Sequence, residues 1–123
     1  MNDIDRLSNT VNQFCQFIEG LPAQALIEQD WGPKEVLTHL VYYHELYVSL
    51  VEACEAGAQI APPEGRFSDL NAAAVAANRG VSPAALVSLF LDEHQKLVEL
   101  YQLHDPSCIV IEIKAGAKPR TLD

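Results

Sequence analysis

Basic side chains are scarce in this chain. It holds 8 lysines and arginines against 17 aspartates and glutamates, which gives a formal net charge of −9. No run of lysine and arginine could follow a phosphate backbone, and the same acidity opposes contact with an anionic membrane surface. We therefore expect neither nucleic acid nor a membrane as a partner.

Long apolar runs, a secretion signal and paired cysteines are also missing. No apolar segment approaches the roughly 20 residues that span a bilayer. The first residues, MNDIDRLSN, carry acids where a secretory signal would carry bases. Cys15, Cys54 and Cys108 lie far apart without a CxxC pair, which favours reduced thiols over disulfides or a zinc finger. These features predict a cytoplasmic protein.

The composition and the spacing of apolar residues predict one all-α domain over residues 1–123. The chain is 49% hydrophobic and long enough for one core. Apolar spacings of three and four, with glycine and proline breakers, predict helices over residues 3–19, 33–56, 69–79 and 83–103. Ser68 and Ser82 are the expected N-caps of the last two. Residues 108–111 are apolar and mostly β-branched and residues 112–114 alternate, which favours a strand or an extended tail, and Thr121 begins what resembles a helix cap.

Three histidines lie on the predicted helices. Successive residues of a helix advance by ~100°, so His39 and His44 point ~140° apart and cannot bind one metal ion from a straight helix. His44 falls in the middle of its helix's apolar arc, His39 at the edge, and His94 in the middle of the arc of the fourth helix. If these helices pack together, His44 and His94 face a shared core. Each is then either a hydrogen-bonded core residue or part of a site.

Two aromatic residues accompany His39. Trp31 lies just before the second helix, where it is either a hydrophobic plug over the end of the bundle or a ligand-stacking residue. Tyr43 lies one turn after His39 and could form a hydrogen bond near it. The sequence carries no Ser-His-Asp signature, phosphate-binding glycine loop or paired-carboxylate motif.

The segment that contains these residues resembles the helix-two signature of the DinB-like superfamily, and is most similar to its ClbS/DfsB branch. The resemblance rests on Trp31-x-Pro33-Lys34-Glu35-Val36-Leu37-x-His39-Leu40, followed by Tyr43-His44-Glu45-Leu46. That branch also carries a proline-rich loop before an aromatic-x-x-Leu-Asn step, here Pro62-Pro63-x-Gly65 and Phe67-Ser68-Asp69-Leu70-Asn71. The two signatures stand in the family's order.

The resemblance implies a DinB-like four-helix bundle in which the short alanine-rich helix belongs to a crossover. In metal-binding members one ligand is the histidine eight residues after the tryptophan, here His39, and an HxxxH-like pair on the last helix supplies the others. Related members are thiol-dependent transferases or isomerases, and ClbS-type members protect against a reactive genotoxin. No residues stand here where that last helix would be, so the implied zinc or nickel site at His39 is incomplete.

A bundle without its last helix would expose apolar helix faces, so we expect a homodimer. Three functions fit the residues. In order, they are a metal- or thiol-dependent transferase or hydrolase, or a protective relative of one, with His39 at its site; a non-enzymatic protein that binds a small molecule; and a structural dimer or partner module. The expected ligand-binding residues are Trp31, Tyr43, His44 and His94.

Overall fold

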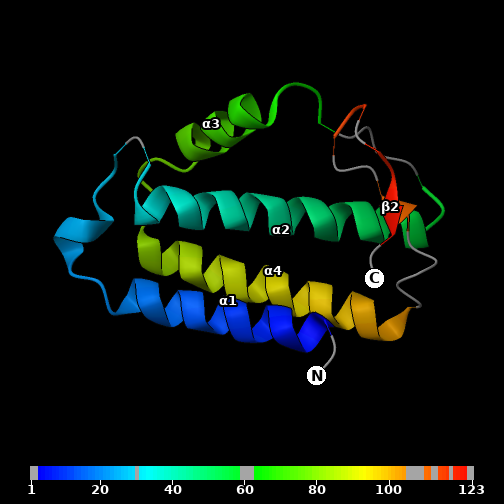
Figure 1. Cartoon of the computed structure of the whole chain (residues 1–123), viewed down its shortest axis with the longest axis horizontal. Helices are drawn as coiled ribbons and strands as arrows, with labels where there is room; N and C mark the ends of the chain where they lie inside the picture. The colour runs from blue at the N-terminus through cyan, green and yellow to red at the C-terminus, as the bar shows by residue number, and fades with distance from the viewer. Residues whose placement is uncertain are drawn as a thin grey trace.

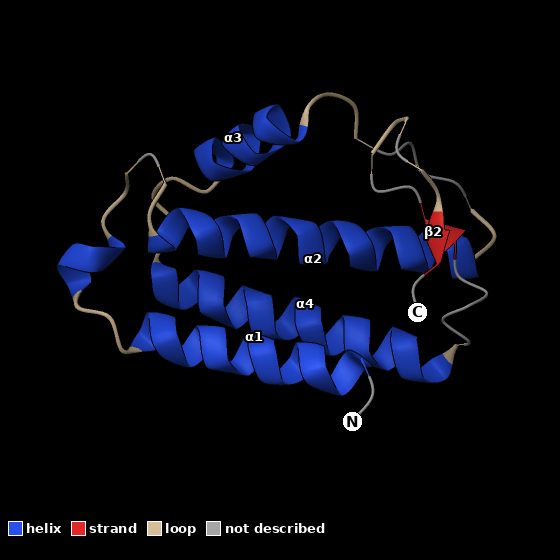
Figure 2. Cartoon of the chain, viewed as in Figure 1, coloured by secondary structure: helices blue, strands red, loops and turns tan. Residues whose placement is uncertain are grey.

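The computed structural model describes residues 3–29, 31–58, 63–104, 110–111, 114–116 and 118–121. Over these ranges the chain forms four α-helices, one 3-10 turn and a two-stranded ribbon (Figures 1 and 2). They are α1 (Asp3–Glu19), η1 (Ala23–Leu26), α2 (Pro33–Glu55), α3 (Phe67–Ala77), α4 (Pro83–Leu103), β1 (Val110–Ile111) and β2 (Arg120–Thr121). The predicted all-α bundle is confirmed.

Three long helices make the body of the molecule. Helix α4 contacts both α2 and α1, and the short α3 contacts α2. Figure 1 shows α2 and α4 running in the same direction, α1 running against them, and α3 lying on the side of α2 away from α4. Helix α2 is therefore covered on two sides, by α4 on one and by α3 on the other.

The main core fills the space between α1, α2 and α4. Phe90 of α4 is 1% exposed and packs edge-on against Phe14 of α1, with ring centroids 6.4 Å apart. Removing this apolar surface from water is the main force that holds the helices together. The buried members of the cluster are Val11, Cys15, Ile18, Leu37, Val41, Leu86, Val87 and Phe90.

The helix starts follow from local chemistry, with one exception. Pro33 opens α2 and Pro83 opens α4, at the position where a missing N–H costs nothing. The Ser82 hydroxyl accepts a hydrogen bond from the Ala85 N–H at 3.1 Å, which confirms the predicted cap. The predicted Ser68 cap is wrong, because α3 begins at Phe67 and Ser68 lies inside its first turn.

The C-terminal part is extended where it is described. Val110 pairs with Thr121 and Ile111 with Arg120 in an antiparallel ribbon. Thr121 therefore pairs as a strand residue, and the helix cap predicted there is wrong. Residues 105–109, 112–113 and 122–123, which include Cys108, lie outside the described residues. No described helix is long and apolar enough to cross a membrane.

The carboxylate of Glu28 joins the two loops at one end of the bundle. It accepts hydrogen bonds from Lys34 Nζ at 2.9 Å, from the Gly80 N–H at 2.8 Å and from Arg79 Nη1 at 3.1 Å. The Lys34 bond first, then the other two, lower the pKa of Glu28 from 4.5 to about 2. Lys34 itself is only 5% exposed, so Glu28 neutralises a buried ammonium group.

Glu28→Gln is expected to lower the melting temperature at neutral pH, because it leaves the Lys34 ammonium buried without an anion. The matched variant Lys34→Met removes that charge but keeps the apolar stem. Its melting temperature should therefore fall by less than that of Glu28→Gln. The pKa of Glu28 is lower in the folded state, so its contribution is present above about pH 4.5 and lost as the pH falls towards 2. Thermal unfolding by circular dichroism across that range checks both points, and an equal loss in the two variants would contradict the argument.

Candidate functional site

The candidate residues divide between two opposite faces of α2. His39 and Tyr43 face α3, whereas His44 faces α4 and meets His94 there. This separation follows from the helical advance between positions 39 and 44. The four expected ligand-binding residues therefore do not form one site. Trp31 and Tyr43 belong to an aromatic cluster with His39, and the other two histidines belong to the core.

The aromatic cluster consists of Trp31, His39, Tyr43 and Phe67. The His39 ring meets Trp31 edge-on at 5.9 Å between centroids and Tyr43 edge-on at 4.8 Å. Tyr43 in turn packs against Phe67 of α3 at 6.3 Å. Trp31 is 56% exposed and Phe67 45% exposed, so both rings lie at the rim. Trp31 is thus no buried plug over the bundle end; it covers the edge of the His39 ring.

The loop that carries Trp31 is held by Glu35. Gly32, the N-cap residue of α2, has no side chain with which to cap the helix, so the capping interaction comes only from Glu35. Its carboxylate accepts hydrogen bonds from the Gly32 N–H at 2.9 Å and the Gln29 N–H at 3.3 Å. The Glu35 side chain is 2% exposed, which keeps these bonds out of competition with water. The backbone on both sides of Trp31 is thereby fixed relative to His39.

The protonation of the neutral His39 ring follows from its partner on α3. Nδ1 of His39 lies 2.9 Å from the Asn71 side-chain oxygen, which can only accept a hydrogen bond. Nδ1 therefore carries the proton, and the lone pair is on Nε2. No hydrogen bond to Nε2 is found within the described part of the chain, so this atom can accept from a ligand. Sequence reasoning did not identify Asn71 as a partner of His39, although it lies in the second resemblance motif.

A pocket of about 350 Å³ lies against this cluster. Its volume is within the range of small-molecule sites. Beside the pocket, the ammonium of Lys114 lies 5.2 Å from the centre of the Phe67 ring. The wall is mostly aromatic, with one imidazole and one carboxamide, and its members are His39, Tyr43, Tyr47, Phe67 and Asn71.

The Tyr43 hydroxyl is the most unusual polar atom beside this pocket. It is buried and has no hydrogen-bond partner among the described residues, and the bond expected near His39 is not formed because the two rings meet edge to face. Burial, and then the neighbouring Tyr42 and Tyr47, raise the pKa of Tyr43, so the phenol stays protonated. An unpaired buried hydroxyl costs about 1–3 kcal/mol relative to a paired one. A ligand or water molecule that accepts this hydrogen bond would remove the cost.

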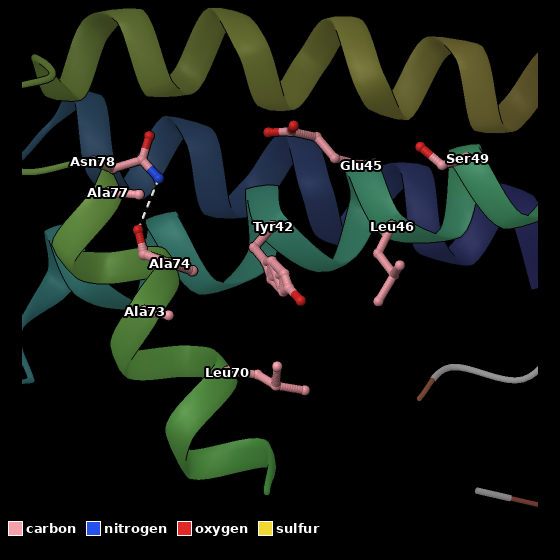
Figure 3. A pocket seen from close by; sticks show the side chains of 9 residues that line it. All are labelled: Tyr42, Glu45, Leu46, Ser49, Leu70, Ala73, Ala74, Ala77 and Asn78. Carbon is pink, nitrogen blue, oxygen red and sulfur yellow. Dashed lines mark hydrogen bonds between the residues drawn. The ribbon is translucent and has the colours of Figure 1, made fainter. Parts of the chain in front are cut away.

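A second pocket of about 420 Å³ lies between α2 and α3. Figure 3 shows Tyr42 and Leu46 projecting from α2 and Leu70 from α3, with Glu45 pointing away from α3. The alanines of α3 bring little bulk to this contact, which leaves the space open. The lining residues are Tyr42, Glu45, Leu46, Ser49, Leu70, Ala73, Ala74, Ala77 and Asn78.

The core histidines form a hydrogen-bonded row with a serine of α1. Ser8 Oγ lies 2.8 Å from His94 Nε2, and His94 Nδ1 lies 3.2 Å from His44 Nε2. Burial, and next the neighbouring His94, lower the pKa of His44 to about 4, and burial lowers that of His94. The sequence did contain a signal for Ser8, since it stands four residues after Ile4 and three before Val11, on the buried stripe of α1.

A metal site is not complete among these side chains. Within the described ranges no group of three or more histidine, cysteine, aspartate or glutamate residues could hold an ion. His39 has an available Nε2, but its described neighbours are aromatic rings and the Asn71 amide. One imidazole falls short of the three protein ligands typical of catalytic zinc. The zinc or nickel ion expected at His39 stays a prediction.

No family model, curated protein or solved structure matches this chain. The resemblance to DinB-like proteins therefore stays a prediction that rests on the residues quoted above.

Tyr43→Phe is expected to stabilise the ligand-free protein by about 1–3 kcal/mol, because it removes a buried donor without a partner and keeps the ring. Tyr47→Phe is the matched control, since Tyr47 lines the same pocket and its hydroxyl is not among the buried unpaired atoms. Urea unfolding compares the two variants with the wild type. A Tyr43→Phe variant less stable than the wild type would show that the hydroxyl has a partner in solution.

Proposed function

We propose that this protein binds a small, planar, uncharged molecule in the pocket beside the aromatic cluster, without chemical conversion. The observation that carries the proposal is the buried Tyr43 hydroxyl, which finds no partner among the described residues and lies beside a wall of aromatic rings. Proteins rarely leave such a group unpaired unless another molecule satisfies it. A binding function therefore accounts for a local cost that the fold alone does not explain.

The chemistry of the pocket defines the ligand. Ring faces and edges from Tyr43, Tyr47 and Phe67 favour an aromatic or conjugated plane. The Tyr43 O–H requires an acceptor, such as a carbonyl oxygen, and the His39 Nε2 lone pair can receive a donor. Neither a carboxylate nor a lysine or arginine is among the described lining residues, and the Lys114 ammonium beside the pocket lies over the Phe67 ring. An uncharged ligand therefore suits the wall. Phe67, at the exposed start of α3, is the side chain that would move to admit the ligand to the Tyr43 hydroxyl.

The enzymatic alternative has less support from the described residues. A thiol-dependent reaction needs a thiolate with a lowered pKa. Cys15 is buried in the core, and burial, with a smaller effect of Glu19, raises the pKa of its thiol. Cys54 packs in a second apolar cluster at the far end of α2. The sequence placed an enzyme first among three functions, whereas the geometry favours the binding protein.

Ligand binding can be followed through the lone tryptophan, since Trp31 contacts His39 at the pocket. Coumarin and 2-quinolone, two neutral fused-ring carbonyl compounds, should quench or shift its fluorescence and release heat in calorimetry. Tyr43→Phe should weaken binding about tenfold, which corresponds to the loss of about 1.4 kcal/mol from one hydrogen bond.

Tyr101→Phe on α4 is the control, because its ring lies outside the aromatic cluster, and binding should be unchanged. Equal affinity of the wild type and the Tyr43→Phe variant would remove Tyr43 from the site. No heat and no fluorescence change with either compound would contradict this ligand class.

The homodimer stays a proposal, supported by the second pocket. That pocket, between α2 and α3, presents Leu46 and Leu70 over an alanine floor and could receive apolar side chains of a second copy. We expect sedimentation velocity at micromolar concentration to show a dimer, and Leu46→Glu to dissociate it, with Leu103→Glu as the control at an exposed apolar residue outside the pocket. A monomeric wild type would contradict the proposal.

A further inference from the structure

When both histidines are neutral, the donor and the acceptor of every hydrogen bond in the core row are fixed. The backbone of Leu40 also forms a hydrogen bond with the His44 ring, and it raises the pKa of that ring. Because Nε2 of His44 faces His94 Nδ1, the nitrogen left for this bond is Nδ1, which then donates to the Leu40 carbonyl, since a carbonyl can only accept. Nε2 of neutral His44 is then an acceptor, so the proton between the two histidines belongs to His94 Nδ1. His94 Nε2 is in turn an acceptor, and Ser8 O–H donates to it. The carbonyl at one end thus sets the tautomer of both rings.

This row can accept one proton without breaking. A proton on His94 Nε2 turns that nitrogen into a donor, and the Ser8 hydroxyl can rotate to accept, because a hydroxyl is both donor and acceptor. The bond from His94 Nδ1 to His44 Nε2 is unchanged. The imidazolium is then hydrogen-bonded on both sides, at the contact of three helices.

A second proton cannot be accommodated in the same arrangement. The free position on His44 is Nε2, which faces His94 Nδ1 at 3.2 Å. Protonation there would set two N–H groups against each other, both on charged rings. The two rings come from α2 and α4, so the repulsion would separate these helices at their main contact. The Phe90 ring, 4.8 Å from the His44 ring and perpendicular to it, leaves His44 no polar alternative on that side.

We infer that Ser8, His94 and His44 form a buried proton-binding site that holds one proton and couples uptake of a second to opening of the contact between α2 and α4. The site lies on the opposite face of α2 from the aromatic cluster, and it does not depend on the proposed ligand.

The charged surroundings agree with this order of events. Glu93 on α4 acts on His44 in the opposite direction to burial, but its carboxylate is paired with Lys96 Nζ at 3.1 Å. From α1 the facing group is the uncharged Ser8. Burial lowers the pKa of both rings, and the neighbouring His94 lowers that of His44 further, to about 4. An unfolded histidine titrates near 6.5, so stability is complete above that pH and is lost as the pH falls from about 6.5 to about 4.

The tautomers can be read directly from long-range ¹H–¹⁵N spectra of the histidine rings in the wild-type protein. We expect Nδ1–H on both His44 and His94 at pH 7.5, with assignments from single substitutions. On lowering the pH, the His94 ring should gain a proton while the protein is folded, and the His44 ring should stay neutral until the folded signals disappear. An Nε2–H tautomer on either ring, or two imidazoliums in the folded state, would overturn the inference.

Thermal unfolding provides the second measurement. Between pH 7.5 and 5.0 the wild type should lose about 5 °C or more in melting temperature, from the proton uptake of the unfolded chain. In H44Q/H94Q, where glutamine keeps polar groups but does not titrate, this dependence should largely vanish. H104Q removes a histidine outside the row, and this variant should keep the pH dependence of the wild type. Equal pH dependence in H44Q/H94Q and the wild type would exclude the row as the proton-binding site, and the spectra decide the question should that double variant not fold.

Discussion

The packing of α2 on two opposite sides is the constraint on which the rest of the structure depends. An ordinary surface helix buries one apolar stripe and leaves its opposite face exposed to solvent. Helix α2 packs against α4 through the apolar core and against α3 through aromatic and small side chains. Both of its faces are thus partly removed from water, so polar groups on either face need partners. His39, Tyr43 and His44 each need hydrogen-bond partners for this reason, and the three find them to different extents.

Both ring nitrogens of His44 have hydrogen-bond partners, an acceptor on its own helix and a donor on α4. The row that results joins three helices with hydrogen bonds in a low-dielectric setting, where each bond is strong and each missing bond is expensive. His39 is satisfied in part, with Asn71 binding one ring nitrogen. The Tyr43 hydroxyl has no partner within the described chain. Among the described residues of α2, the unsatisfied hydrogen-bonding capacity therefore lies on the α3 face, and a ligand site is better sought there than between α2 and α4.

Much of this arrangement can be derived from the sequence, because it depends on periodicity and local caps. The helix of residues 3–19 was predicted with its observed bounds, and the approach of His44 to His94 followed from their places on two apolar arcs. What the sequence could not show are contacts between distant segments. Glu28 meets Gly80 across 52 positions, and His39 meets Asn71 across 32, only because a loop and a short helix fold back on α2. Ser68 resembled a cap, but packing of Phe67 on Tyr43 accompanies an earlier helix start.

The two histidine environments also explain why residue type alone is a poor guide to a site. Burial lowers the pKa of both histidines in the core, yet every described ring nitrogen there has a partner. A shifted pKa in that setting reports desolvation of a satisfied structure. The aromatic cluster instead has an available acceptor, His39 Nε2, and an unpaired donor, the Tyr43 hydroxyl, beside the same pocket. Open hydrogen-bonding capacity next to accessible volume is what distinguishes a binding surface from a polar core, and in the described chain these two features coincide on the α3 face of α2.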